Sequence, residues 1–212
     1  MIRRQDEGPL SILTLDRPDK ANSLTRAMLV DLTGHLRALS GQAQAVILTG
    51  AGRVFSAGAD LDEARAGLAT DPVWEELSAT LAAMPALTVA ALNGTLAGGA
   101  FGMALACDIR LAVPGAKFFY PVMKLGYLPQ PSDPARLAAL VGSGRARMIL
   151  MAGARIEAEE ALAWGLVDRL SSPEALLDAA RALTADACAA PAGHAGRIKA
   201  LIPRHGAWAS PG

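Results

Sequence analysis

Asn93-Gly-Thr-Leu-Ala-Gly-Gly-Ala-Phe-Gly-Met-Ala-Leu-Ala-Cys-Asp108 is the stretch that decides the fold of this chain. It follows an apolar, strand-like run at residues 87–92, turns on glycine and then takes the composition of a helix. A second segment, Val54-Phe-Ser-Ala-Gly-Ala-Asp60, follows the apolar run 45–49 in the same manner. A helix that opens at such a turn leaves backbone N–H groups without intrahelical partners. Two such turns side by side would direct two N–H donors at one oxygen atom, which is the geometry of an oxyanion hole.

Strand and helix patterns alternate on both sides of these turns. Strands are predicted at residues 11–15, 45–49, 87–92, 109–113 and 117–120, and helices at 25–39, 71–84 and from the glycine turn to 107. From about residue 133 the pattern is helical throughout, with helices near 143–152, 157–164 and 173–188. The sequence therefore predicts the α/β fold class with a helical C-terminal section. We expect one domain over residues 1–212, with the α/β core at about 1–140 and the helical section at about 141–212.

The composition excludes several classes of protein. Of the 212 residues, 52% are hydrophobic and 19% are charged, which favours a large core over disorder. The 20 basic residues balance the 20 acidic ones, so we expect no nucleic-acid partner and no attraction to an anionic membrane surface. Small anionic ligands stay compatible with this balance, because they need only local cations.

Cysteine usage and the N-terminus indicate a cytoplasmic protein. Cys107 and Cys188 form no C-x-x-C pair and are expected to be reduced thiols, and the three histidines assemble no metal site. The N-terminus is polar, so no signal peptide is expected. The stretch 77–107 has no charge, but proline, asparagine and glycine residues interrupt it, which favours a buried strand and helix over a membrane span.

Four stretches of sequence, in chain order, carry a resemblance to a known family. They are Arg17-Pro-Asp-Lys-Ala-Asn-Ser-Leu24; Leu48-Thr-Gly-Ala-Gly-Arg-Val-Phe-Ser-Ala-Gly-Ala-Asp-Leu61; Val89-Ala-Ala-Leu-Asn-Gly-Thr-Leu-Ala-Gly-Gly99 running to Ala106-Cys-Asp-Ile109; and Ala161-Leu-Ala-Trp-Gly-Leu-Val-Asp168. Over about residues 8–200 the chain resembles the crotonase (enoyl-CoA hydratase/isomerase) superfamily. The resemblance implies a spiral of ββα units, binding of an acyl-CoA thioester, and assembly as a homotrimer or a hexamer. It implies no cofactor beyond the coenzyme A of the substrate.

The resemblance also implies a set of site residues. In the register of the family the oxyanion-hole donors fall on the backbone N–H groups of Ala57 and Gly99, which would polarise the thioester carbonyl and stabilise the enolate. The positions expected to contact acyl-CoA are Lys20, Ala21, Arg53, Ala59, Asp60, Leu61, Gly98, Pro121, Val122 and Leu125. Lys20 and Arg53 either meet phosphate or are solvated surface cations. Asp60 either binds or serves as the N-cap of the helix that follows it.

The sequence departs from the family where a hydratase has its two glutamates. In register, the first glutamate falls on Gly102 and the second on Val122, and neither residue can transfer a proton. A third position, an aspartate in some members, falls on Gln130, which can donate a hydrogen bond but cannot act as a base. Tyr127 and Asp133 remain as weaker candidates. Tyr127 is either a core or interface aromatic or a proton donor, and Asp133 is expected chiefly as the N-cap before Pro134.

Three functions stay open at this point. The first is an acyl-CoA enzyme that retains the oxyanion hole and decarboxylates a malonyl-type thioester without a glutamate pair. The second is a hydratase or isomerase that uses another carboxylate, namely Asp133. The third is an inactive acyl-CoA-binding or assembly protein, because fold alone does not separate these interpretations. The C-terminal section is shorter than is usual for the family, which makes trimer formation less secure than the fold.

Overall fold

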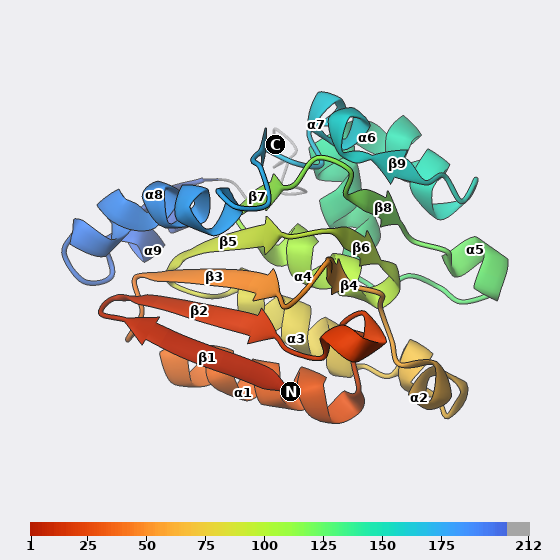
Figure 1. Ribbon diagram of the computed structural model, residues 1–212, viewed down its shortest axis with the longest axis horizontal. Helices are drawn as coiled ribbons and strands as arrows, with labels where there is room; N and C mark the ends of the chain where they lie inside the picture. Colours follow the sequence, from red (N-terminus) through yellow and green to blue (C-terminus); the bar gives the residue numbers. More distant parts are fainter. Residues whose placement is uncertain (203–212) are drawn as a thin grey trace, which may run out of the picture.

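The computed structural model describes residues 1–202 as two mostly parallel sheets surrounded by helices (Figure 1). The first half of the chain forms β1 (Ile2–Glu7), β2 (Leu10–Leu15), η1 (Pro18–Lys20), α1 (Arg26–Leu39), β3 (Ala45–Gly50), β4 (Val54–Ser56), α2 (Leu61–Arg65), η2 (Leu68–Thr70), α3 (Val73–Ala82), β5 (Leu87–Leu92), β6 (Thr95–Ala97), η3 (Gly98–Ala100) and α4 (Phe101–Ala106). The second half forms β7 (Ile109–Ala112), β8 (Lys117–Phe119), α5 (Val122–Leu125), α6 (Asp133–Leu150), β9 (Ile156–Glu157), α7 (Ala158–Trp164), β10 (Arg169–Leu170), α8 (Leu176–Ala189) and α9 (His194–Leu201). The predicted α/β class is confirmed.

Consecutive pairs of strands build a spiral. The larger sheet has the order β1-β2-β3-β5-β7-β10, and the smaller has the order β4-β6-β8-β9. The pairs β3 and β4, β5 and β6, and β7 and β8 each place one strand in the larger sheet and the next strand in the smaller one. Within each sheet these strands are parallel to those of the neighbouring turn, so equivalent strand ends lie side by side. The carboxyl ends of β4 and β6 therefore meet at one place, which is where both glycine turns begin.

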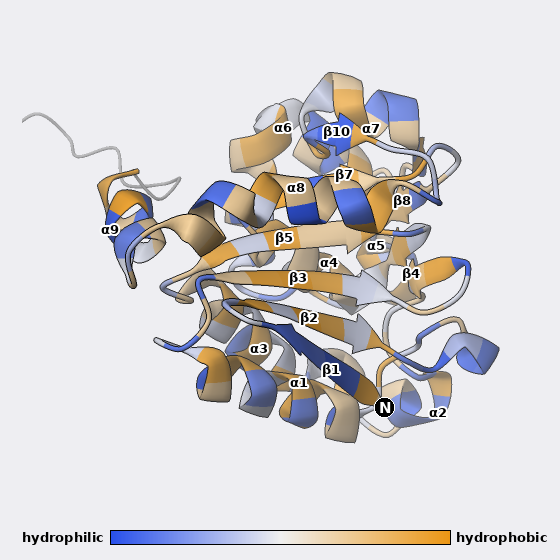
Figure 2. Ribbon diagram, turned by 60° about the vertical axis from the view of Figure 1, so that its left-hand side comes forward, coloured by the Kyte–Doolittle hydropathy of each residue, from blue (hydrophilic) through white to orange (hydrophobic). Residues whose placement is uncertain are grey.

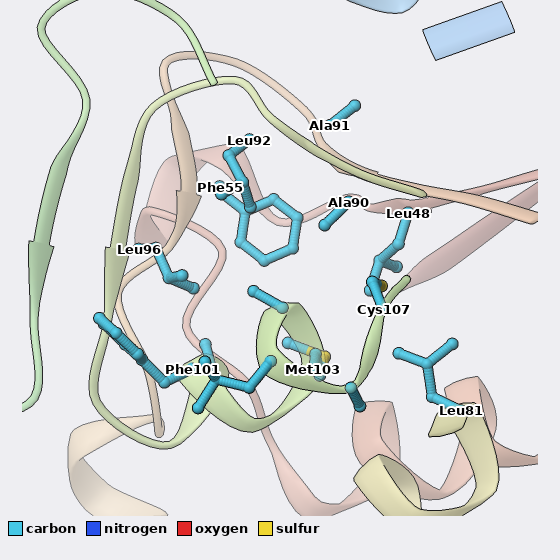
Figure 3. Packing of buried hydrophobic residues seen from close by; sticks show 14 of the residues in the cluster. Leu48, Phe55, Leu81, Ala90, Ala91, Leu92, Leu96, Phe101, Met103 and Cys107 are labelled. Atoms are coloured by element: carbon cyan, nitrogen blue, oxygen red, sulfur yellow. The ribbon is translucent and has the colours of Figure 1, made fainter. Parts of the chain in front are cut away.

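The core fills the space between the larger sheet and the helices α1, α3 and α4 (Figure 1). Helix α1 buries one stripe of side chains, which is the helical spacing of an amphipathic segment: Met28, Leu29, Leu32, Leu36 and Leu39. Helix α8 packs against β3, β5 and β7 on the opposite face (Figure 2). Figure 3 shows the ring of Phe55, from β4, lying near Leu92 and close to helix α4, which carries Phe101 and Met103. The short strand β4 is thus anchored by an aromatic side chain with no exposure to solvent.

Three short features were not predicted from the sequence. Strand β1 is hydrophilic along its length (Figure 2) but pairs antiparallel with β2 over six residues on each strand, as an edge of the larger sheet. The C-terminal section is not helical throughout, because β9 extends the smaller sheet and β10 extends the larger one. The helical pattern predicted from about residue 133 is confirmed by helix α6, which begins at Asp133, but its break from helical geometry at Gly142, where φ is 81°, was not predicted. Two-residue strands carry too little periodicity to be recognised in a helical context.

Two asparagine side chains hold the turn between β3 and β4. Asn22 is fully buried, accepts from the Arg17 amide at 2.8 Å and donates to the carbonyl oxygens of Ala51 and Val54 at 2.8 and 2.7 Å. Asn93 accepts from the Gly50 amide at 3.0 Å and donates to the Gly52 carbonyl at 2.9 Å. Since Asn93 directly follows β5, these bonds fix one turn of the spiral against the next.

The residue after Asn93 is expected to tolerate no side chain. A β-carbon at Gly94 would lie 2.0 Å from the carbonyl oxygen of Arg53, a backbone atom that cannot move without displacing β4. We expect Gly94→Ala to lower the free energy of unfolding by roughly 3 kcal/mol, the upper range for overpacking. The matched control is Gly34→Ala in the exposed middle of α1, where a β-carbon meets nothing within 4 Å and alanine should stabilise by roughly 0.5–1 kcal/mol. Chemical denaturation of both variants measures the difference; equal stabilities would contradict the close packing of the two turns.

Candidate active site

A cavity of about 220 Å³ opens where the two glycine turns meet. Helix α3, the segment between β8 and α6, and the start of α2 complete its wall. The lining residues are Ala57, Ala59, Leu61, Ala64, Ala69, Trp74, Ala97, Gly98, Gly99, Phe119, Tyr120, Pro121, Val122, Leu125, Tyr127, Leu128 and Gln130. Within the described residues 1–202, no aspartate, glutamate, lysine, arginine or histidine lines this cavity. Its polar groups are therefore backbone amides, two tyrosines, a tryptophan N–H and one glutamine.

The two glycine turns touch each other through their backbones. Gly58 and Gly98 both have positive φ, at 94° and 57°, which side-chain-bearing residues rarely adopt. A β-carbon at Gly58 would lie 3.0 Å from the Ala97 carbonyl oxygen, and one at Gly98 would lie 3.6 Å from the Gly58 α-carbon. Glycine at these positions lets the backbones of the two turns approach within van der Waals contact.

The structure corrects one of the two predicted oxyanion-hole donors. The N–H of Ala57 donates to the carbonyl oxygen of Ala21 at 3.0 Å, so it is not free to bind a substrate oxygen. Two residues later, Ala59 lies opposite Leu24 in a parallel β-bridge. Leu24 makes both hydrogen bonds of this bridge with the neighbours of Ala59: its N–H donates to the Gly58 carbonyl at 2.8 Å, and its carbonyl accepts from the Asp60 N–H at 2.9 Å. In this pattern the N–H of Ala59 itself points to the other side of the strand.

The second predicted donor lies where expected. Gly99 is the middle residue of η3, so its N–H belongs to the first turn of a helix and has no intrahelical acceptor. Among residues 1–202, neither the Gly99 amide nor the Ala59 amide donates a backbone hydrogen bond. Both residues line the cavity. The geometry therefore favours Ala59 and Gly99, in place of Ala57 and Gly99, as the pair of free donors.

The cavity brings together most of the predicted contact residues but not all of them. Ala59, Leu61, Gly98, Pro121, Val122, Leu125, Tyr127 and Gln130 line it. Lys20, Ala21, Arg53 and Asp60 do not line it, and the side chains of Lys20 and Arg53 are exposed. Asp60 is confirmed as an N-cap, because its Oδ1 accepts from the amides of Asp62 and Glu63 at 3.2 and 3.4 Å. The Arg17 guanidinium donates to Asp60 Oδ2 at 2.8 Å and, with these caps, lowers the pKa of the Asp60 carboxyl.

Trp74, in α3, is a cavity residue that the sequence analysis missed. It belongs to the apolar stripe of an amphipathic helix, so its pattern indicates only core. A β-carbon at Gly99 would lie 3.2 Å from the Trp74 ring, which therefore packs directly against this glycine. Trp74 Nε1 donates to the Leu68 carbonyl at 2.8 Å, which fixes the ring.

Asp133 is not the helix cap that the sequence predicts. Ser132 is the capping residue of α6, and no side chain caps that end. The carboxyl of Asp133 instead turns inward, with no exposure to solvent, and accepts a 3.0 Å hydrogen bond from the hydroxyl of Tyr120 at Oδ2. Its Oδ1 is buried without a hydrogen-bond partner among residues 1–202.

The Asp133 carboxyl lies directly beside Gly102, in α4. A β-carbon at Gly102 would be 3.0 Å from Oδ1 and 3.3 Å from Oδ2 of Asp133. The carboxyl thus occupies the space into which a side chain at position 102 would project. Spacing in the sequence gives no sign of this, because residues 102 and 133 lie on different helices.

Burial dominates the electrostatics of this group. Removal from water raises the pKa of Asp133 to about 7, with Glu75 adding to the rise and with Tyr120 and Arg136 opposing it. The pKa of Tyr120 is raised as well, first by burial and then by the neighbouring Asp133. Tyr120 lines the cavity and stacks on Phe101 with ring centroids 5.4 Å apart. A carboxyl with a pKa of about 7 therefore lies behind the cavity wall and is hydrogen-bonded to Tyr120.

Comparison with known proteins gives a consistent result. The sequence profile of the family described as "Enoyl-CoA hydratase/isomerase" matches residues 6–205. YngF of Bacillus subtilis is 37% identical over 83% of this chain, and the short-chain-enoyl-CoA hydratase of Clostridium acetobutylicum is 33% identical over 84%. The chain spans 71% of the length of each of these two relatives.

Solved structures agree with the sequence comparison. The enoyl-CoA hydratase of Bacillus anthracis superposes with a TM-score of 0.88 at 30% identity, covering 95% of this chain and 81% of that one. DspI of Pseudomonas aeruginosa superposes with a TM-score of 0.87 at 32% identity, covering 95% of this chain and 85% of that one. No helix among residues 1–202 is long and apolar enough to cross a membrane.

The buried Asp133 carboxyl predicts a stability that depends on pH. Its pKa in the folded state, about 7, exceeds the unfolded value of 3.8, so the wild type loses stability as the pH rises through this range. The amide that replaces the carboxyl in Asp133→Asn cannot ionise, so the stability of the variant relative to wild type should rise by roughly 3 kcal/mol between pH 5 and pH 8. Urea denaturation at the two pH values measures this, with Asp19→Asn at an exposed position of η1 as control. A difference that is independent of pH would show that Asp133 is ionised throughout.

Proposed function

The chain belongs to the enoyl-CoA hydratase/isomerase family, and from that premise we propose that it is an enzyme that stabilises the enolate of an acyl-CoA thioester at the amides of Ala59 and Gly99. The observation that carries this proposal is a pair of amides on adjoining turns that donate no backbone hydrogen bond within residues 1–202. Both amides border a cavity whose described wall carries no carboxylate, imidazole or cationic side chain. Two such donors stabilise an oxyanion most strongly where water is excluded.

The reaction that fits this cavity best is decarboxylation of a malonyl-type thioester. The bond between the α-carbon and the carboxylate breaks, and carbon dioxide departs. The electron pair of that bond stays with the thioester and forms the enolate that the two amides stabilise. This chemistry needs no base, which agrees with glycine and valine at positions 102 and 122. An apolar wall also disfavours the substrate carboxylate relative to a transition state in which its charge moves to the thioester oxygen.

Hydration of an enoyl-CoA is the second candidate, because several relatives carry that activity in their names. The observation in its favour is the Asp133 carboxyl at the place of a side chain on Gly102. Against it, Asp133 has no exposure and does not line the cavity, so it has no contact with a water molecule positioned there. A non-catalytic acyl-CoA-binding protein is the remaining alternative.

The rest of the binding site follows from the same proposal. The exposed cation of Lys20 is adjacent to Ala21, which accepts a hydrogen bond from the Ala57 amide, and that of Arg53 directly precedes β4. Both would contact the phosphates of coenzyme A outside the cavity. The homotrimer or hexamer and the cytoplasmic location remain predictions of the sequence.

Assays with purified protein separate the three functions. We expect carbon dioxide release from malonyl-CoA and methylmalonyl-CoA, because both can pass directly to an enolate. Little loss of the enoyl absorbance of crotonyl-CoA is expected, because no carboxylate of residues 1–202 lines the cavity. Rapid hydration of crotonyl-CoA would overturn the decarboxylase in favour of the hydratase. Tight binding of coenzyme A without turnover of any of these thioesters would indicate the non-catalytic protein.

Position 99 tests the oxyanion hole. In Gly99→Ala the new β-carbon would lie 3.2 Å from the Trp74 ring, so the turn must shift. This shift would move the amide of residue 99 away from the substrate oxygen. We expect kcat to fall about 100-fold or more, the usual cost of one oxyanion-hole donor. Combining Gly99→Ala with Trp74→Phe removes part of the clash and should restore part of kcat. Full activity in Gly99→Ala would contradict the assignment, and Gly34→Ala supplies the control for a glycine replacement elsewhere.

A further inference from the structure

We propose that Tyr120 is the acid that protonates the α-carbon of the enolate, and that Asp133, acting through Tyr120, holds the proton that this step consumes. The proposal rests on the proposed function, because it requires an enolate bound at Ala59 and Gly99. Decarboxylation of a thioester leaves a carbanion equivalent that must gain a proton, so the site needs an acid even though it needs no base. Tyr120 would be the catalytic residue, and Asp133 a positioning and proton-holding residue.

The placement of the two groups carries the inference. Tyr120 follows β8 and lines the cavity, whereas Asp133 begins α6 and lies behind it, beside Gly102. The Tyr120 hydroxyl is 3.0 Å from Asp133 Oδ2. The pair therefore extends from the wall of the cavity, which Tyr120 borders, into the interior, where the Asp133 carboxyl lies.

The hydrogen bonds of the Tyr120 hydroxyl determine where its proton can go. Its oxygen accepts a hydrogen bond from the backbone N–H of Gln130 at 3.4 Å. When Asp133 is protonated it can donate to the same oxygen, whose two acceptor positions are then filled. The phenolic hydrogen is then left for a third partner, and the ligand cavity is the open space that Tyr120 borders.

The charged groups around Asp133 leave its proton in place. Glu75, in α3, is engaged by the amide and the hydroxyl of Ser132, and its negative charge opposes ionisation of Asp133. Arg136, one turn along α6, donates to the Ser78 hydroxyl at 2.9 Å and favours ionisation only at a distance. Tyr120 supplies the one hydrogen bond that the carboxyl accepts when it is ionised, and Oδ1 has no partner among residues 1–202. A carboxyl without a counter-ion in contact keeps its proton to a higher pH than an ordinary aspartate does, here to about pH 7.

The proton moves from the interior to the substrate in one concerted transfer. The enolate electron pair at the α-carbon forms a C–H bond with the phenolic hydrogen of Tyr120 while the thioester carbonyl re-forms. The electrons of the broken O–H bond stay on the Tyr120 oxygen, which takes the proton of Asp133 in the same step. Asp133 is left as a carboxylate and regains its proton from solvent after the product leaves. No phenolate accumulates, which agrees with the raised pKa of Tyr120.

The face of protonation tests Tyr120. Methylmalonyl-CoA turned over in deuterium oxide gives propionyl-CoA with one deuterium on the α-carbon, and wild type should place it on one face. In Tyr120→Phe we expect carbon dioxide release to persist at a reduced rate while the product becomes racemic, because solvent then supplies the deuteron. A stereospecific product from Tyr120→Phe overturns the assignment. Tyr127→Phe is the matched comparison, since Tyr127 is the other cavity tyrosine and is 39% exposed; racemisation in that variant alone would move the role to Tyr127.

The pH profile tests Asp133. Because the protonated form is the active one, wild-type kcat should be level below pH 7 and fall about tenfold per pH unit above it. Asp133→Asn keeps the hydrogen bond to Tyr120 but carries no acidic proton, so its kcat should be lower and level across the same range, with KM little changed. A wild-type profile retained in Asp133→Asn overturns the role of Asp133.

A titration without substrate separates failure of this inference from failure of the proposed function. The carbon-13 signal of the Asp133 carboxyl, identified by its absence in Asp133→Asn, should titrate near pH 7 in wild type and move in Tyr120→Phe. A signal that titrates near pH 4, the range of an ordinary aspartate, overturns the proton-holding role even if decarboxylation is observed. If no thioester is turned over but the signal titrates near 7, the proposed function fails and the proton-transfer role of Tyr120 falls with it.

Discussion

Contact between two backbone turns is the constraint on which the rest of the site depends. Gly58 and Gly98 lie so close that a side chain at Gly58 would meet the Ala97 carbonyl. The parallel pairing of β4 with β6 places the two turns at the same edge of the smaller sheet. Hydrogen bonds from the side chains of Asn22 and Asn93 hold the loop between β3 and β4 in place. This contact brings the amides of Ala59 and Gly99 to the same cavity, because each is placed by its own turn. Neither helix alone would supply the pair.

The fold class was predictable because its local signals are clear. Apolar runs of strand length at 45–49 and 87–92 alternate with helical patterns, which predicts the α/β class, and the family resemblance implied the spiral of ββα units. The hydrophilic strand β1 could not be found in this way, since it owes its existence to pairing with β2 and not to its own composition. The two-residue strands β9 and β10 likewise form only because a sheet edge is already present.

The site was predictable in part. Ala57 and Gly99 were predicted from the register of the family motifs. Among residues 1–202 the Gly99 amide donates no backbone hydrogen bond and borders the cavity, whereas the Ala57 amide is occupied. Ala57 and Ala59 are both small residues flanking Gly58, and only the hydrogen bond from Ala57 to Ala21 distinguishes the occupied amide from the free one. Asp133 was predicted to be a cap because an Asp-Pro pair commonly begins a helix. Its inward orientation follows from the empty space at Gly102, which is a tertiary relation that no local pattern records.

The carboxyl at Gly102 has a mechanical consequence. A side chain on position 102 would be rigidly connected to the oxyanion-hole turn through α4, but Asp133 belongs to α6, which is joined to α3 through Glu75 and Ser132 and through Arg136 and Ser78. The distance between the two parts of the site is therefore a property of helix docking and not of one continuous backbone. Partial undocking of α6 would separate the carboxyl from the amides while both sheets stay intact, so mild denaturant or pressure would remove Asp133 from the site before the protein unfolds.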